Sequence, residues 1–246
     1  GVKLSSLNTY AIANLSSVQL KGLTTLQVAS LNTAAIQALS TAQVSSLTTG
    51  FVRALSTTQI RALETRDVAV LSNASLGALS SNQLRALDTN QIAGLTTAQV
   101  ASFNTTIINA LTTSQIAALE TRDVAVLSST NIAALSSNQL RALDAGQISA
   151  LTNNQLTNLN STTVGQLSTD QIAALTSNQV RALGTAQIVS LTTVQAAALN
   201  TSTLRALTTE QIAALETRDV AVLSAANLDA FTSTQLRALD TAQISG

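Results

Sequence analysis

Residues 95 to 102 read Leu95-Thr-Thr-Ala-Gln-Val-Ala-Ser102, and residues 207 to 214 read Leu207-Thr-Thr-Glu-Gln-Ile-Ala-Ala214. From Leu7 to the end of the 246-residue chain, this eight-residue pattern repeats thirty times without an insertion. We number the positions of each octad 1 to 8 from that leucine. Position 1 is Leu or Phe in every octad, and position 6 is Ile, Val or Leu in all but one. Positions 1 and 6 are therefore predicted to form the core.

The polar positions of the octad predict a helix start. Position 2 is Ser, Thr, Asn or Asp in 26 octads, and position 5 is Gln in 18. A short polar side chain before a helix accepts hydrogen bonds from free backbone N–H groups, and a Gln three residues later reaches back to the cap. We expect a helix of about six residues over positions 3 to 8, with its N-cap at position 2.

The charged residues support the same helix phase. Eleven of the twelve acidic residues lie at positions 2, 4 or 5, and eight of the twelve basic residues lie at position 7. Acids near the start and bases near the end of a helix complement its dipole. The position-7 bases are Lys21, Arg53, Arg61, Arg85, Arg141, Arg181, Arg205 and Arg237.

One continuous helix does not fit the pattern, because each octad would rotate the apolar stripe by about 80°. The helix must break in every octad, and such short helices need neighbours to stabilise them. The predicted fold is all-α: a solenoid of very short helices running as one domain over residues 1–246, cut from a longer array. The alternative is a β-solenoid, favoured by Thr, Val and Ile and opposed by the absence of Pro, the scattered Gly and the abundant Ala, Leu and Gln.

A longer-range pattern suggests how the octads wind. The octad Leu-Glu-Thr-Arg-Asp-Val-Ala-Val occurs at 63–70, 119–126 and 215–222. Copies of the segment Leu/Val-Arg-Ala-Leu contain Arg85, Arg141, Arg181 and Arg237, one in each copy, and these copies lie seven, five and seven octads apart. If these octads share one side, about 2.4 octads form a turn.

Composition narrows the function classes. The chain has no His, Cys, Met, Trp or Pro, and its charges balance. We therefore expect no enzyme activity, no catalytic residue, no cofactor and no metal, because the commonest acid/base groups, nucleophiles and metal ligands are missing. A neutral chain has no field to attract nucleic acid, and its apolar stretches are too short for a membrane span.

The densest charge clusters lie in the thrice-repeated octad. In each cluster an Arg separates two acids, and two carboxylates are too few to surround a calcium ion. We therefore expect each cluster to be a solvated helix start. The main alternative is a contact with a neighbouring subunit. Pairs such as Arg85 with Asp88 are expected to span the corners. The cluster residues are Glu64, Arg66, Asp67, Glu120, Arg122, Asp123, Glu216, Arg218 and Asp219.

The Leu-Thr-Thr-Ala-Gln-Val-Ala-Ser pattern resembles octapeptide arrays of very large bacterial secreted or surface proteins, often labelled as adhesion or haem-utilisation proteins. The resemblance implies an extracellular or cell-surface location. The haem label has no support, because Tyr10 is the one possible axial ligand. The leading interpretation is a structural filament, surface-layer or spacer component that self-associates. An adhesin stalk presenting one face to a protein or glycan is the second, and an ice-binding protein is a remote third.

Overall fold

The computed structural model describes residues 9–245, which leaves Leu7, the first predicted core residue, outside the described part. Its secondary structure consists of thirty helices of four to six residues, one per octad, with no strand among the described residues. The all-α prediction is confirmed, and the β-solenoid is wrong. The chain divides into two compact units, residues 1–126 and 127–246. That all thirty octads form one continuous domain stays a prediction.

The first unit contains α1 Thr9–Ala13, α2 Ser17–Lys21, α3 Thr25–Ala29, α4 Thr33–Gln37, α5 Thr41–Ser45, α6 Thr49–Ala54, α7 Thr57–Ala62, α8 Thr65–Val70, α9 Asn73–Gly77, α10 Ser81–Ala86, α11 Thr89–Ala93, α12 Thr97–Ala101, α13 Thr105–Ala110, α14 Thr113–Ala117 and α15 Thr121–Val126. The second contains α16 Ser129–Ala133, α17 Ser137–Arg141, α18 Ala145–Ala150, α19 Asn153–Thr157, α20 Ser161–Val164, α21 Thr169–Ala173, α22 Ser177–Ala182, α23 Thr185–Val189, α24 Thr193–Ala198, α25 Thr201–Ala206, α26 Thr209–Ala213, α27 Thr217–Ala221, α28 Ala225–Leu228, α29 Ser233–Leu236 and α30 Thr241–Ser245.

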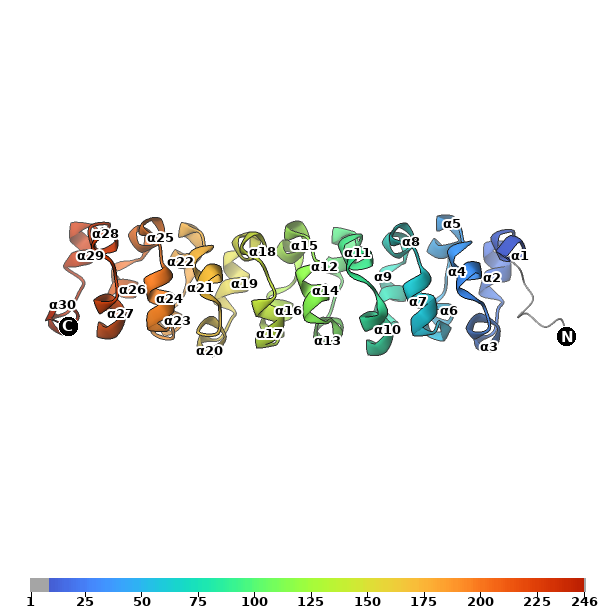
Figure 1. The fold of residues 1–246 in the computed structure, drawn as a ribbon, viewed down its shortest axis with the longest axis horizontal. Helices are drawn as coiled ribbons and strands as arrows, with labels where there is room; N and C mark the ends of the chain where they lie inside the picture. Colours follow the sequence, from blue (N-terminus) through green and yellow to red (C-terminus); the bar gives the residue numbers. More distant parts are fainter. Residues whose placement is uncertain (1–8, 246) are drawn as a thin grey trace. The chain divides into compact units, whose positions relative to one another are not determined.

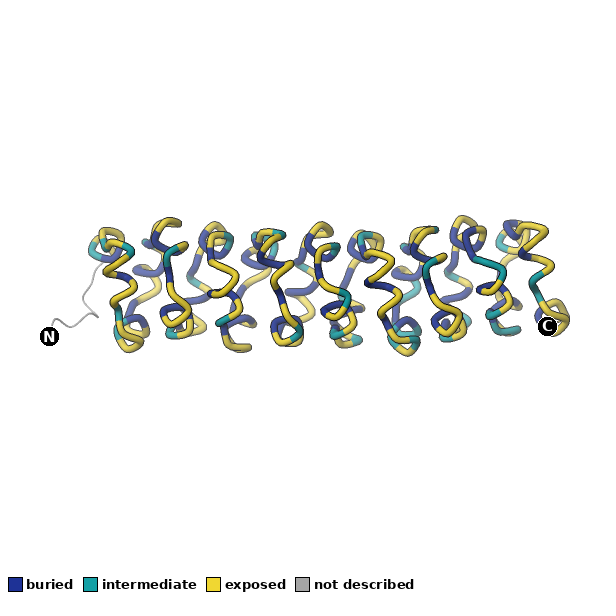
Figure 2. Tube along the Cα trace, turned by 180° about the vertical axis from the view of Figure 1, so that it is seen from behind, coloured by how far each residue is buried: buried dark blue, intermediate teal, exposed yellow. Residues whose placement is uncertain are grey.

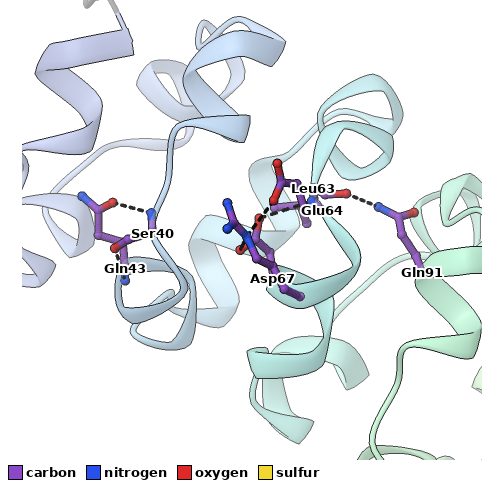
Figure 3. Close-up of polar contacts among 7 residues, drawn as sticks. Ser40, Gln43, Leu63, Glu64, Asp67 and Gln91 are labelled. Carbon is purple, nitrogen blue, oxygen red and sulfur yellow. Dashed lines mark hydrogen bonds and ion pairs between the residues drawn. The ribbon is translucent and has the colours of Figure 1, made fainter.

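The predicted capping box begins most of these helices. In α5 the Gln43 backbone N–H donates to the Ser40 hydroxyl oxygen at 3.2 Å, and the Ser40 N–H donates to Gln43 Oε1 at 2.8 Å (Figure 3). Two of the backbone N–H groups that a helix leaves unpaired at its start are satisfied in this way. The caps thus fix where each octad turns from corner to helix.

The corners need no special residue. At the α10–α11 corner, Leu87 has φ −60° and ψ 132°, and Asp88 has φ −80° and ψ 172°. Both are ordinary extended conformations open to any L-residue. No residue in the described range has a positive φ, which explains how a chain without Pro and with scattered Gly can form a corner between every two successive helices.

Successive helices wind with three octads to the turn. In each unit, the helices that pack closely are three apart in chain order, such as α7 with α10 and α22 with α25 (Figure 1). One turn is therefore three octads of eight residues, or 24 residues. The predicted 2.4 octads per turn is wrong, and so is the common side derived from it: α8 and α15 of the first unit, seven octads apart, fall in different columns of stacked helices.

The core lies along the inside of each turn. Positions 1 and 6 are buried through most of both units, as in Ile92 and Leu95, and the caps and the outer helix faces are exposed (Figure 2). This confirms the predicted core positions. Position 5 is also buried: Gln91 and Gln147 are each 1% exposed, as polar side chains in an otherwise apolar interior.

Candidate functional site

The buried glutamines join successive turns. One turn earlier, the Nε2 group of Gln91 donates to the carbonyl oxygen of Leu63 in the corner after α7, at 2.6 Å (Figure 3). It also donates to the carbonyl oxygen of Ile60, within α7, at 3.1 Å. The same pair of bonds, to residues 28 and 31 positions back, recurs at Gln115 in the first unit and Gln171 in the second. We call this contact the glutamine clamp.

Each clamp satisfies both ends of one amide. While Nε2 of Gln91 donates to the earlier turn, its Oε1 accepts the Asp88 backbone N–H at 2.8 Å. A buried amide with all its polar atoms bonded stabilises the fold, whereas an unsatisfied one costs about 1–3 kcal/mol. The residue that caps its own helix therefore also sets the register between turns.

Sequence reasoning identified the cap but missed the clamp. A capping box accepts Glu as readily as Gln, yet position 5 holds Gln 18 times and Glu never. Glutamate supplies only the acceptor for the cap, and glutamine adds a donor. The absence of Glu is the signal that could have revealed a second bond.

The position-7 arginines form a second link between turns. Nε of Arg85 donates to the Ala110 carbonyl oxygen at 3.1 Å, and Nε of Arg181 donates to that of Ala206 at 3.2 Å. Each acceptor ends the helix stacked one turn later, so the guanidinium stabilises a neighbour's C-terminus. The predicted Arg85–Asp88 pair is wrong, because no ion pair joins these two side chains in the described part of the chain.

The predicted charge clusters lie at the starts of α8, α15 and α27. An ion pair joins Arg66 Nε to Glu64 Oε2 at 2.6 Å, and the second and third copies pair Arg122 with Glu120 and Arg218 with Glu216. These Glu and Arg side chains are partly exposed. They stay available for the subunit contact that the sequence suggests, which remains a prediction.

The aspartate of each cluster is buried, unlike its Glu and Arg. Asp67, Asp123 and Asp219 are 0% exposed, so the expectation of a solvated cluster is wrong for them. They occupy position 5, the clamp position, and the helix carries that position inward. Burial raises the pKa of all three carboxyl groups above the usual value for Asp, and the adjacent guanidinium opposes the shift.

In residues 9–245, no three His, Cys, Asp or Glu side chains gather as a metal site would require. Many Ser and Thr hydroxyls at position 2 serve as caps, as in Ser136 and Thr176. None of the helices in this range is both long enough and apolar enough to cross a bilayer.

Comparison with known families supports the octad analysis. A family model described as the ALTTAQ repeat matches residues 60–97, 70–105, 116–153, 153–185, 196–224 and 212–246, together more than half of the chain. No curated protein matches the chain.

Proposed function

Because the chain belongs to the ALTTAQ-repeat family, we propose that it is a non-catalytic structural protein that builds length, as a filament, surface-layer or spacer component. The glutamine clamp is the observation that carries this proposal. It makes each turn a template for the next, so stability grows with the number of turns and needs no distant contact. The buried hydrogen bonds of the clamps join each turn to the next, as a chain that builds length requires.

Self-association is part of this proposal. Within each unit, every turn of three octads presents the same core and clamp positions to the next turn along the chain. A second copy that continued this stack would remove apolar surface from water, the main driving force for association. A head-to-tail contact of this kind extends without closing.

We further propose an extracellular or cell-surface location in a bacterium. A surface covered by Ser and Thr, balanced charge and the absence of cysteine suit an exposed spacer that does not depend on redox conditions. An adhesin stalk would use the same architecture, with binding carried by one column of helices.

Electron microscopy of the purified chain over a range of concentrations tests the proposal. Fibres that lengthen with concentration would support self-association. Separate particles at every concentration would exclude it for this chain. Saturable binding of a protein or glycan by those particles would favour the adhesin stalk instead.

A further inference from the structure

Three octads place an aspartate where the others place the clamp glutamine. Asp67, Asp123 and Asp219 share the octad Leu-Glu-Thr-Arg-Asp-Val-Ala-Val and are fully buried. A carboxylate only accepts hydrogen bonds, whereas the clamp requires a donor. These octads therefore keep the inward-pointing polar group but lack the proton that joins the turns.

Asp67 shows how the exchange works (Figure 3). Its Oδ2 accepts the Glu64 backbone N–H at 3.2 Å, which is the bond that a glutamine Oε1 makes. Its Oδ1 has no hydrogen-bond partner and lies 3.9 Å from Arg66 Nε. This second oxygen corresponds to the glutamine Nε2, and by the clamp register of 28 and 31 residues its counterparts are the carbonyls of Leu39 and Ile36.

The other two copies have a related defect. Both carboxylate oxygens of Asp123 and of Asp219 are buried and make no hydrogen bond of normal geometry. The Thr97 hydroxyl and the Glu120 N–H oppose the rise of the Asp123 pKa, and the Glu216 N–H opposes that of Asp219, but burial has the larger effect. The clamp register assigns Asp123 to the Leu95 carbonyl and Asp219 to the Leu191 carbonyl. An oxygen lone pair that faces another in a dry interior is costly until a proton lies between them.

Asn227 provides a natural reference for this geometry, because Asn and Asp have the same shape. At the same octad position, its Nδ2 donates to the Leu199 carbonyl oxygen at 3.2 Å, 28 residues back. The shorter side chain therefore still reaches the earlier corner. An aspartic acid with its proton on the equivalent oxygen has a donor at the same place.

We propose that Asp67, Asp123 and Asp219 are proton-dependent clamps that hold adjacent turns together when protonated and loosen them when ionised. The charged groups nearby lie mainly on each aspartate's own octad: Glu64 with Arg66, Glu120 with Arg122, and Glu216 with Arg218. Helices α5, α12 and α24, packed one turn earlier, carry no charged residue, and neither do α11 and α30, packed one turn later on α8 and α27. Asp88 and Asp240 cap those two later helices.

The direction of the pH effect follows from burial. Each aspartate pKa is raised in the folded chain, so the folded state holds a proton that the unfolded chain, with a pKa of about 3.9, has released. Stability is therefore highest at acidic pH, falls as the pH rises from about 4 through the raised pKa, and stays low above it. The three octads become the weakest joints of the array at neutral pH.

The test replaces all three aspartates with asparagine, which donates at every pH. Urea unfolding of the wild type at pH 4.5 and 7.5 is expected to give a higher midpoint at pH 4.5. Asp67→Asn with Asp123→Asn and Asp219→Asn should raise the midpoint at pH 7.5 and remove most of the difference. The matched control, Asp170→Asn with Asp229→Asn, neutralises two exposed acids and should keep that difference.

Hydrogen exchange provides a local measurement on the same proteins. At pH 7.5, backbone amides of residues 36–46 and 63–70 should exchange more slowly in the asparagine variant than in the wild type. Three outcomes would overturn the proposal: a wild-type midpoint that does not fall between pH 4.5 and 7.5, an asparagine variant less stable at pH 7.5, or sodium or calcium chloride that stabilises the wild type but not the variant, which would indicate a cation in place of the proton.

Discussion

Gln91 and Leu63 lie 28 residues apart and are joined by a hydrogen bond of 2.6 Å between the Nε2 amide and the carbonyl oxygen. This bond links two turns, and the Oε1 of the same amide caps its own helix. One side chain therefore connects local structure, formed within an octad, to the winding of the solenoid.

Gln91→Ala removes both functions of that amide at once. It leaves the carbonyls of Leu63 and Ile60 without their buried donor, so the free energy of unfolding should fall by about 1–3 kcal/mol. Urea unfolding at neutral pH measures the loss. Asn90→Ala, at the exposed position 4 of the same octad, is the control and should change stability by less than about 0.5 kcal/mol. Equal losses in the two variants would contradict the clamp.

The sequence predicted the elements of this fold better than their winding. Helix, cap and core follow from contacts within eight residues, so the octad contains them. The number of octads per turn depends on the corner conformation of residues such as Leu87 and on which earlier corner a glutamine reaches. Neither can be predicted from the sequence of a single octad. The buried aspartates were misplaced for a related reason, because a charged side chain at a helix start looks solvated until the neighbouring turn covers it.

Ile172 tests the core assignment. It lies at position 6 and is fully buried. Ile172→Asp should destabilise the second unit by more than about 4 kcal/mol, since a lone charge is removed from water. Circular dichroism during heating would show lost helix or a large drop in the melting midpoint. Asn178→Asp, at an exposed position 4, adds the same charge and should melt like the wild type.

Gly165 and Gly77 differ in the space available for a side chain. A Cβ at Gly165 would lie 2.8 Å from the Ser190 carbonyl oxygen, whereas a Cβ at Gly77 would meet nothing within 4 Å. Gly165→Ala should therefore destabilise the chain by about 1–3 kcal/mol through overpacking. Gly77→Ala should stabilise it by about 0.5–1 kcal/mol, because alanine loses less backbone entropy in a helix. Thermal unfolding of the two variants side by side checks the difference in sign.

Gln115→Glu should convert an ordinary clamp into a pH-dependent one. The Gln115 amide is buried and donates to the carbonyl oxygens of Leu84 at 2.7 Å and Leu87 at 2.8 Å, so an ionised glutamate would place an acceptor against two acceptors. The folded chain should then favour the protonated acid. The loss of stability should be small near pH 4 and should grow as the pH rises above the unfolded glutamate pKa of about 4.3.

Ser114→Glu is the matched control for this change, because it adds the same charge at the neighbouring exposed position 4. Urea unfolding of both variants at pH 4 and pH 7.5 separates a buried acid from a surface one. We expect Gln115→Glu to lose at least about 2 kcal/mol relative to Ser114→Glu at pH 7.5, since an ionised group replaces a hydrogen-bond donor in the interior. Equal stability of the two variants at pH 7.5 would mean that a negative charge is tolerated at the clamp position, and the aspartates of the three repeated octads would then need another explanation.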